Sequence, residues 1–224
     1  MNPQEPVTPS VQSTPPAPSQ PVPAAERDVS KKSSGGLKNV FATIAILVAA
    51  PIVALLITSF LFQSYEVFGP SMQTTLHNGD RLIVVKAPRT WAKIKHEIFM
   101  PERGQIVIFT KVDLLLDNGE GSKQLIKRVM ALPGERVVVK DNVLTVYNAA
   151  HPEGFQPDKQ GAYGSVIKST AIDGEWTVGA GQVFVCGDNR GNSLDSRTFG
   201  PIDTSDIVGT AAFRFLPVNT SRTF

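Results

Sequence analysis

The chain has a single cysteine, Cys186, and only three histidines. One cysteine cannot form an intrachain disulfide, so an exported domain of this chain would depend on its apolar core for stability. Cys186 lies in an apolar run without an evident histidine partner, which indicates a core position. The zinc-peptidase motif His-Glu-x-x-His is absent, because no second histidine follows His96-Glu97 at the required spacing. His77 lies in a polar turn, which indicates a surface position.

Neither sign of charge dominates the composition, since 22 Lys and Arg stand against 20 Asp and Glu. The chain also lacks a long basic stripe and a helix-turn-helix pattern, so nucleic acid is not an expected partner. A length of 224 residues suits one domain with appended segments rather than two large domains.

Charged residues are missing altogether from Asn39 to Tyr65. This run exceeds the roughly 20 apolar residues that a membrane-spanning helix needs. A buried helix of a soluble protein is an alternative, but such helices normally carry polar interruptions. A cleavable secretory signal is a second alternative, and the run is too long and too far from Met1 for it. Pro51, in the middle of the run, is expected to kink the helix rather than end it.

Basic residues precede the apolar run, whereas Glu66 is the first charge after it. The positive-inside rule therefore predicts a single-pass protein of the cell membrane with a cytoplasmic N-terminus. Eight of the 17 prolines fall between Pro3 and Pro23, a composition typical of disorder. We expect a disordered cytoplasmic tail over residues 1–37, a transmembrane helix over 38–64 and an extracytoplasmic β-rich domain over 65–224.

Short runs of β-branched and aromatic residues follow the apolar segment and predict strands. They cover residues 82–85, 105–109, 136–140, 143–147, 182–186 and 207–213. Lys140-Asp141-Asn142 between two of the runs is a hairpin signal, and continuous apolar triplets suggest burial on both faces. The expected fold class is mostly β, with coiled antiparallel sheets or a partly closed barrel. Residues 148–172 lack periodicity and are interpreted as a loop or insertion, as are residues 111–122.

Ser71 and Lys127 are the candidate chemical groups of this domain. A serine hydroxyl is a poor nucleophile until a base removes its proton, and no Gly-x-Ser-x-Gly elbow surrounds Ser71, because Gln73 replaces the second glycine. Lysine can serve as the base when it is neutral, and burial in an apolar site lowers its pKa from about 10.4. Lys127 has such a setting between Ile126 and Val129, although a lysine in an apolar run more often extends its amine to the surface.

Three segments together resemble the signature motifs of type I signal peptidases. The first is GPSMQTTL around Ser71, the second is LIKRVMALPGE around Lys127, and the third is GDNRGNSLDSR, which starts at Gly187. They occur in the order of that family, behind one apolar segment, and the resemblance covers about residues 60–215.

The resemblance implies that Ser71 is the nucleophile and Lys127 the general base. It places Gly69, Pro70 and Met72 beside the nucleophile, near the oxyanion and the substrate. Some family members have a serine hydroxyl two residues before the nucleophile that helps to bind the oxyanion. The residue here is Gly69, so a second donor has to come from elsewhere, while the Ser71 backbone N–H still contributes.

The third motif supplies supporting residues by the same resemblance. Ser193 is expected to hydrogen-bond the lysine amine, and Asp195 and Arg197 to support the loop of that serine. Asp188 is expected to pair with Arg128, which ties the third motif to the lysine strand.

The implied activity is removal of N-terminal signal peptides from exported preproteins by a Ser71/Lys127 dyad, after small residues and without a metal or organic cofactor. The expected partners are signal peptides of secreted preproteins and the lipid bilayer, with the export translocon as a further candidate. The substrate would bind in extended form along a sheet edge, and an exposed apolar patch near Phe60–Phe68 would rest on the membrane.

Two alternative functions fit the sequence less well. A self-cleaving Ser-Lys protease of the repressor type would cut an Ala-Gly bond upstream of its nucleophile, whereas Ala180-Gly181 lies downstream of both residues. A membrane-anchored β-domain for binding or scaffolding would not need the intact motifs.

Overall fold

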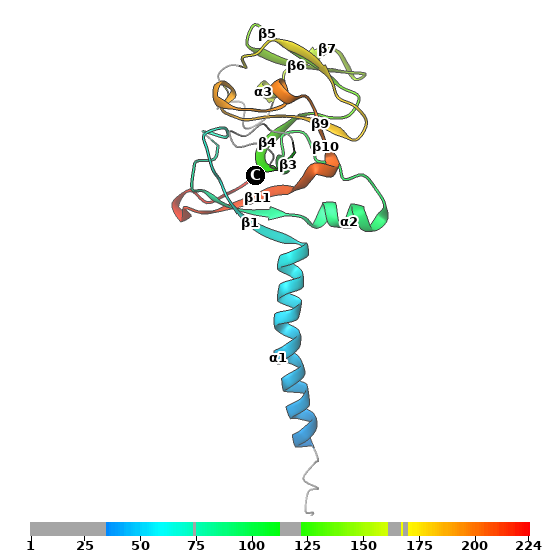
Figure 1. Ribbon diagram of the computed structural model, residues 1–224, viewed down its shortest axis with the longest axis vertical. Coiled ribbons are helices and arrows are strands. Elements are labelled where there is room, and N and C mark those ends of the chain that lie inside the picture. Colours follow the sequence, from blue (N-terminus) through cyan, green and yellow to red (C-terminus); the bar gives the residue numbers. More distant parts are fainter. Residues whose placement is uncertain (1–34, 74, 113–121, 161–166, 168–169) are drawn as a thin grey trace, which may run out of the picture. The chain divides into compact units, whose positions relative to one another are not determined.

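A computed structural model describes residues 35–73, 75–112, 122–160, 167 and 170–224 (Figure 1). The expectation of a disordered tail over residues 1–37 falls almost entirely outside these residues. Helix α1 runs from Gly35 to Phe60 and passes through Pro51 without ending. Residues Lys38–Thr58 have a mean hydropathy of 2.9 and are not buried, so α1 is long and apolar enough to cross a membrane.

The sequence prediction placed the end of the helix at residue 64, four residues beyond its end in the structure. The structure ends α1 at Phe60, and strand β1 begins at Phe62. The reason is tertiary, because Phe62–Glu66 pair in antiparallel register with strand β2 and so adopt extended backbone.

A large antiparallel sheet forms the main body of the domain. Its described strands follow the order β1-β2-β11-β3-β4-β9-β10, with β12 paired to β11. The bounds are β1 Phe62–Glu66, β2 Arg81–Val85, β3 Ile106–Lys111, β4 Lys123–Ala131, β9 Gln182–Cys186, β10 Ile202–Asp203, β11 Ile207–Leu216 and β12 Arg222–Thr223. In this order β1 and β10 are the two ends and do not pair with each other, so the sheet is open rather than closed into a barrel.

A second sheet has the order β7-β6-β5-β8. Its strands are β5 Arg136–Lys140, β6 Val143–Asn148, β7 His151–Phe155 and β8 Gly174–Thr177. The predicted hairpin joins β5 and β6, and Asp141 and Asn142 both have positive φ, as a two-residue turn of type I′ requires.

The interpretation of residues 148–172 as a loop is wrong for its first part. His151–Phe155 form strand β7, which pairs with β6, and Pro157–Gln160 form the short helix α3. The strand contains Pro152 and Gly154, which weaken the sequence signal for a strand but are tolerated at the edge of a sheet.

Both faces of the large sheet are buried at β3 and β9, as their continuous apolar runs predict, whereas β1 is mostly exposed and β2 alternates between buried and more exposed residues. Along β3, Ile106 and Ile108 pack in one core cluster while Val107 and Phe109 pack in another. Figure 1 shows the second sheet, with β5 and β6, next to β9 and β4 of the large sheet. A third cluster contains side chains from these four strands and includes Cys186, which is buried as expected for a core residue. Burial raises the pKa of the Cys186 thiol above its ordinary value, which keeps it protonated.

Helical elements connect the strands. Helix α2, Ala87–Lys95, follows β2, and α4, Ser196–Phe199, follows β9. Single 3-10 turns, η2 Arg190–Asn192, η3 Thr204–Asp206 and η4 Val218–Thr220, complete the described elements.

Candidate active site

Ser71 lies in a tight turn between β1 and β2. The turn is closed by the Gln73 N–H, which donates to the Pro70 carbonyl, and by the Leu76 N–H, which donates to the Met72 carbonyl. Met72 and Leu76 are buried in the core cluster beneath the turn. Because these two side chains anchor the segment, Ser71 is held at the surface of the core and stays half-buried.

Lys127 reaches Ser71 from strand β4. Its Nζ lies 2.8 Å from the Ser71 Oγ, and it also donates to its neighbour's carbonyl, that of Ile126, at 3.0 Å. The lysine is only 3 % exposed. Two groups that are 56 residues apart in the sequence are therefore within hydrogen-bond distance of each other.

The amine of Lys127 is easier to deprotonate than an ordinary lysine. Burial lowers its pKa from 10.5 to about 8, and the nearby Asp195 opposes this only in part. Desolvation disfavours the ammonium form, because the surrounding protein cannot replace its hydration.

A cleft of about 670 Å³ opens beside the pair. One side is formed by β1 and the segment that follows it, from Ser64 to Ser71, and the other by Lys123–Lys127 at the start of β4. Gly69 and Pro70 line the cleft, as expected, and so does Leu194 from the third motif.

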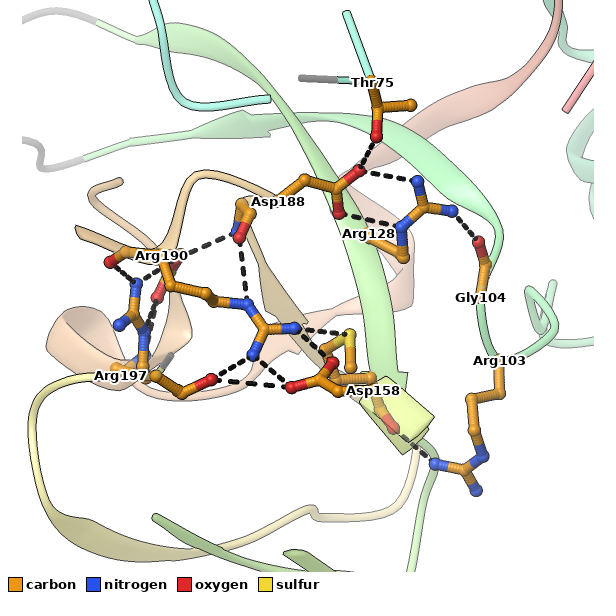
Figure 2. Close-up of polar contacts among 12 residues, drawn as sticks. Thr75, Arg103, Gly104, Arg128, Asp158, Asp188, Arg190 and Arg197 are labelled. Atoms are coloured by element: carbon orange, nitrogen blue, oxygen red, sulfur yellow. Dashed lines mark hydrogen bonds and ion pairs between the residues drawn. The ribbon is translucent and has the colours of Figure 1, made fainter. Parts of the chain in front are cut away.

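Asp188 and Arg128 form the predicted ion pair, and the pair is fully buried. The guanidinium of Arg128 donates to both carboxylate oxygens at 2.8 and 2.6 Å (Figure 2). Thr75 Oγ1 donates to the same carboxylate at 2.5 Å, and Arg128 also donates to the Gly104 carbonyl. The Asp188 carboxylate thus links strand β4, which carries Lys127, to the segment just after Ser71. Sequence reasoning missed Thr75 as a partner of this carboxylate.

Asn189 is a second residue that sequence reasoning missed. Its backbone N–H donates to the Ser71 carbonyl at 3.0 Å, and its side-chain amide donates to the Pro70 carbonyl at 3.1 Å. Two hydrogen bonds therefore hold the backbone of the serine turn to the third motif. The motif itself was the only available signal, because nothing local to Asn189 indicates contact with a turn 119 residues away.

Asp195 and Arg197 pair with each other, and both side chains are completely buried. Asp195 also accepts a hydrogen bond from the Gly187 N–H, and Arg197 donates to the Arg190 carbonyl. These bonds fold residues 187–197 into one compact loop.

Arg190 ties this loop to the segment that carries α3. Its guanidinium donates to both carboxylate oxygens of Asp158, at 2.7 and 2.6 Å, and also to Thr170 Oγ1 and the Met130 Sδ (Figure 2). The side chain of Arg190 is buried, so the charge has to be compensated. Asp158 lies in the region interpreted as a loop, which is why this partner was not predicted.

Comparison with known proteins decides the family. The family model described as signal peptidase, peptidase S26, matches residues 40–216. The chain is 36 % identical over 194 residues to signal peptidase I of Bacillus licheniformis, which covers 86 % of this chain and 97 % of that one. It is 40 % identical over 179 residues to signal peptidase I T of Bacillus subtilis strain 168, which covers 79 % and 85 % of the two chains.

The chain belongs to the signal peptidase family, peptidase S26. It is thus a peptidase and a hydrolase. A solved signal peptidase I from Enterococcus faecalis is also similar, with 27 % identity, a TM-score of 0.36, and coverage of 51 % of this chain and 98 % of that one.

One expectation that came from the S26 resemblance is wrong in this structure. Ser193 does not bond the Lys127 amine, and its buried Oγ has no hydrogen-bond partner among the described residues. The side chain packs instead against Gly187, where a Cβ would lie 2.2 Å from the Ser193 Oγ and 2.4 Å from the Ser71 carbonyl oxygen. The lysine already bonds Ser71 and the Ile126 carbonyl, so the alignment of its amine does not need Ser193 here.

A second correction to the S26-based expectations concerns Met72. It does not line the cleft, and with 1 % exposure it belongs to the core under the serine turn. Gly69, the departure from some family members, has φ +87°, a conformation that favours glycine over any residue with a Cβ. Its N–H donates to Asn78 Oδ1 at 3.0 Å, so Gly69 offers neither a hydroxyl nor a free N–H to an oxyanion.

Proposed function

We propose that this peptidase is a membrane-anchored serine endopeptidase that removes N-terminal signal peptides from exported preproteins after small residues. Ser71 is the nucleophile and Lys127 is the general base. The observation that carries the proposal is the 2.8 Å contact between the Ser71 Oγ and a buried lysine amine whose pKa is lowered to about 8. At pH 7 the neutral fraction of a lysine with that pKa is roughly 300-fold larger than that of an ordinary lysine.

In the proposed reaction, the neutral Lys127 amine takes the proton of the Ser71 hydroxyl as the Oγ attacks the scissile carbonyl. The lysine then passes this proton to the leaving amine as the peptide C–N bond breaks, which leaves an acyl-enzyme on Ser71. Water hydrolyses the ester, with Lys127 again as the base. The mature protein leaves as the amine and the signal peptide as the acid.

The oxyanion needs donors that are not already used. The Ser71 N–H makes no hydrogen bond to any described residue, so it is available to the oxyanion. Gly69 cannot supply the second donor, because its N–H already bonds Asn78. Asp188, Arg128, Asp195 and Arg197 act through the loop geometry, since their charges are paired with one another and buried.

The cleft suits an extended peptide. Strand β1 pairs with β2 on one side only, and Lys123–Lys127 of β4 pair with β3 but not with β9, so both walls present strand edges within the described residues. A substrate can therefore add as a strand between them. Ile108 and Ile126 line the cleft, and such apolar walls favour uncharged side chains next to the scissile bond. The preference for small side chains is what the family resemblance implies.

Membrane anchoring by α1 completes the proposal. The N-terminus is cytoplasmic, residues 38–60 span the bilayer, and the β-domain lies on the outer face, close to substrates that are held by their own apolar segments. Phe60 and Phe62 have exposed side chains at the end of α1, in line with an apolar patch that rests on the lipid, and Phe68 is exposed beyond the far end of β1. The export translocon remains a candidate partner.

Processing of a precursor tests the proposed dyad. Full-length enzyme in detergent or vesicles is mixed with a preprotein, and release of the mature protein is followed on gels. Ser71→Ala and Lys127→Ala are expected to lower the rate by at least about 10⁴-fold, as loss of a nucleophile or base does elsewhere.

Ser221→Ala and Lys140→Ala are the matched controls, because both residues are exposed. They are expected to process the precursor at the unaltered rate. Wild-type rates in either active-site variant would exclude that residue from the mechanism.

A further inference from the structure

Helix α2 carries its large apolar side chains on the outside. Ala92 faces the sheet and is 8 % exposed, whereas Trp91 and Ile94 are 60 % and 65 % exposed. Trp91 and Ile94 are three residues apart and so share one face of the helix. A surface helix of a soluble domain turns its large apolar side chains inward, so this helix presents an apolar face with no partner in the described part of the chain.

The flanks of that face are basic. The segment from residue 86 to 96 contains no acidic residue and four basic ones: Lys86, Arg89, Lys93 and Lys95. Arg89 donates to the Ser205 carbonyl, which attaches α2 to the domain. The Lys95 amine lies 5.6 Å from the Trp91 ring centroid, so the cationic and aromatic groups occupy the same patch. A tryptophan beside lysines is the combination that favours a lipid–water interface.

The start of α2 is bonded to the end of α1. The Lys86 N–H donates to the Leu61 carbonyl at 2.8 Å, and Thr90 Oγ1 donates to the carbonyl of Phe60, the last residue of α1, at 3.2 Å. A helix bonded to the residues where the apolar span ends lies at the level where that span leaves the lipid. Beyond α2, the side chains of Ile98 and Met100 are also exposed.

We propose that α2 is an interfacial helix that lies on the surface of a bilayer containing anionic phospholipids. Trp91 and Ile94 enter the headgroup–acyl boundary, and Lys93 and Lys95 contact the lipid phosphates. The inference rests on the proposed membrane anchoring by α1 and deepens it, because a second contact beside the span limits how far the domain, with its cleft, can tilt. Charge complementarity selects anionic lipid over a neutral surface.

The test uses Trp91 as a reporter in full-length protein. The chain has two tryptophans, so Trp176→Phe leaves Trp91 alone. The protein is reconstituted into phosphatidylcholine vesicles with brominated acyl chains, with or without about 30 % phosphatidylglycerol. Bromine quenches a ring only at contact, and labelled lipid in both leaflets makes protein orientation irrelevant. We expect at least about twofold quenching with phosphatidylglycerol, and much less without it or at 1 M salt.

Charge variants identify the contact. Lys93→Gln with Lys95→Gln is expected to abolish most of the dependence on phosphatidylglycerol. The matched control, Lys140→Gln with Lys159→Gln, changes two exposed lysines, one in β5 and one in α3. It is expected to leave the dependence on phosphatidylglycerol unchanged. Cleavage of a short soluble peptide is expected to be unchanged in both pairs, which shows that the domain is folded.

Alkaline carbonate extraction separates the two ways of failing. Protein that is extracted from the vesicles is not anchored, which overturns both the anchoring and the role of α2. If the protein is retained in the vesicles but Trp91 is not quenched, only the role of α2 is overturned. The apolar face of α2 would then bind another partner, such as a membrane protein. Equal quenching with and without phosphatidylglycerol also overturns the proposal, because it removes the preference for anionic lipid.

Discussion

Lys127 illustrates how a single residue is changed by where the chain places it. In water it would be a cation throughout the physiological pH range, but at 3 % exposure its charged form loses hydration and its pKa falls to about 8. The same burial therefore makes the residue chemically useful and costly to the fold. Two measurable consequences follow at this scale, one in rate and one in stability.

The rate of the chemical step is expected to rise with pH and to level off above about pH 8, because in the proposed mechanism only neutral Lys127 accepts the serine proton. Single-turnover cleavage of a precursor from pH 6 to 10 measures this directly. A profile that is flat over this range, with chemistry rate-limiting, would contradict lysine as the base.

Lys127→Met is expected to stabilise the fold below pH 8. The folded-state pKa of about 8 lies below the unfolded value of 10.5, so the unfolded chain binds more protons and stability of the parent protein rises as pH rises between these values. Below pH 8 the buried charge costs about 3 kcal/mol, which the neutral methionine avoids. Denaturant unfolding at pH 7 and pH 10.5 measures the difference, which should shrink at the higher pH. A variant less stable than the parent at pH 7 would be inconsistent with this charge penalty.

At the scale of elements, the site depends on one loop, residues 187–197, that contacts both β4 and the serine turn. Asp188 reaches β4 through Arg128, and Asn189 reaches the turn through the Ser71 and Pro70 carbonyls. Arg190 extends the connection to α3 through Asp158. The loop thus has separable contacts whose removal should have different effects.

Asp188→Asn is expected to destabilise the fold by about 3–5 kcal/mol, because it removes the buried carboxylate that pairs with the Arg128 guanidinium. Thermal unfolding at pH 7 measures the change. Glu175→Gln is the matched control, since its ion pair with Arg136 is about half exposed, and it should cost less than about 1 kcal/mol. Equal effects of the two variants would show that burial of the Asp188 pair does not matter.

Asn189→Ala is expected to lower kcat by about tenfold, since a small displacement of Ser71 misaligns its attack. KM and the unfolding temperature should change little, because one partly exposed hydrogen bond is lost. Asn192→Ala, an exposed residue of the same loop, serves as the control in the same steady-state assay. A loss of stability without a loss of kcat would mean that Asn189 is only structural.

On the scale of the whole molecule, the proposed anchor and catalytic domain act together by confinement. An enzyme and a substrate held on the same bilayer meet at a higher effective concentration than in solution. Removal of residues 1–60 is therefore expected to lower kcat/KM for a membrane-inserted precursor by at least about tenfold. The truncated enzyme should cleave a short soluble peptide within about twofold of the full-length rate. Both rates are measured in the same vesicle preparation. Equal losses for both substrates would mean that α1 supports the domain itself.

Local signals in the sequence determined much of this protein. An uncharged run of sufficient length determines an apolar helix, β-branched runs determine the strands, and Asp141-Asn142 determines the turn between β5 and β6. Each depends on neighbouring residues along the chain. The motif order around Ser71 and Lys127 similarly carried the family, which the comparisons confirm.

Only the tertiary structure decided the rest. The end of α1 at Phe60 depends on pairing with β2, and the role of Asn189 depends on a turn 119 residues earlier. The family resemblance assigned Ser193 to Lys127, but in the structure Ser193 makes no bond to Lys127 and its side chain packs beside Gly187. The physical reason is the same in each case. Hydrogen-bond partners, burial and the pKa of Lys127 depend on which segments lie side by side in the fold, and separation along the chain does not show which segments these are.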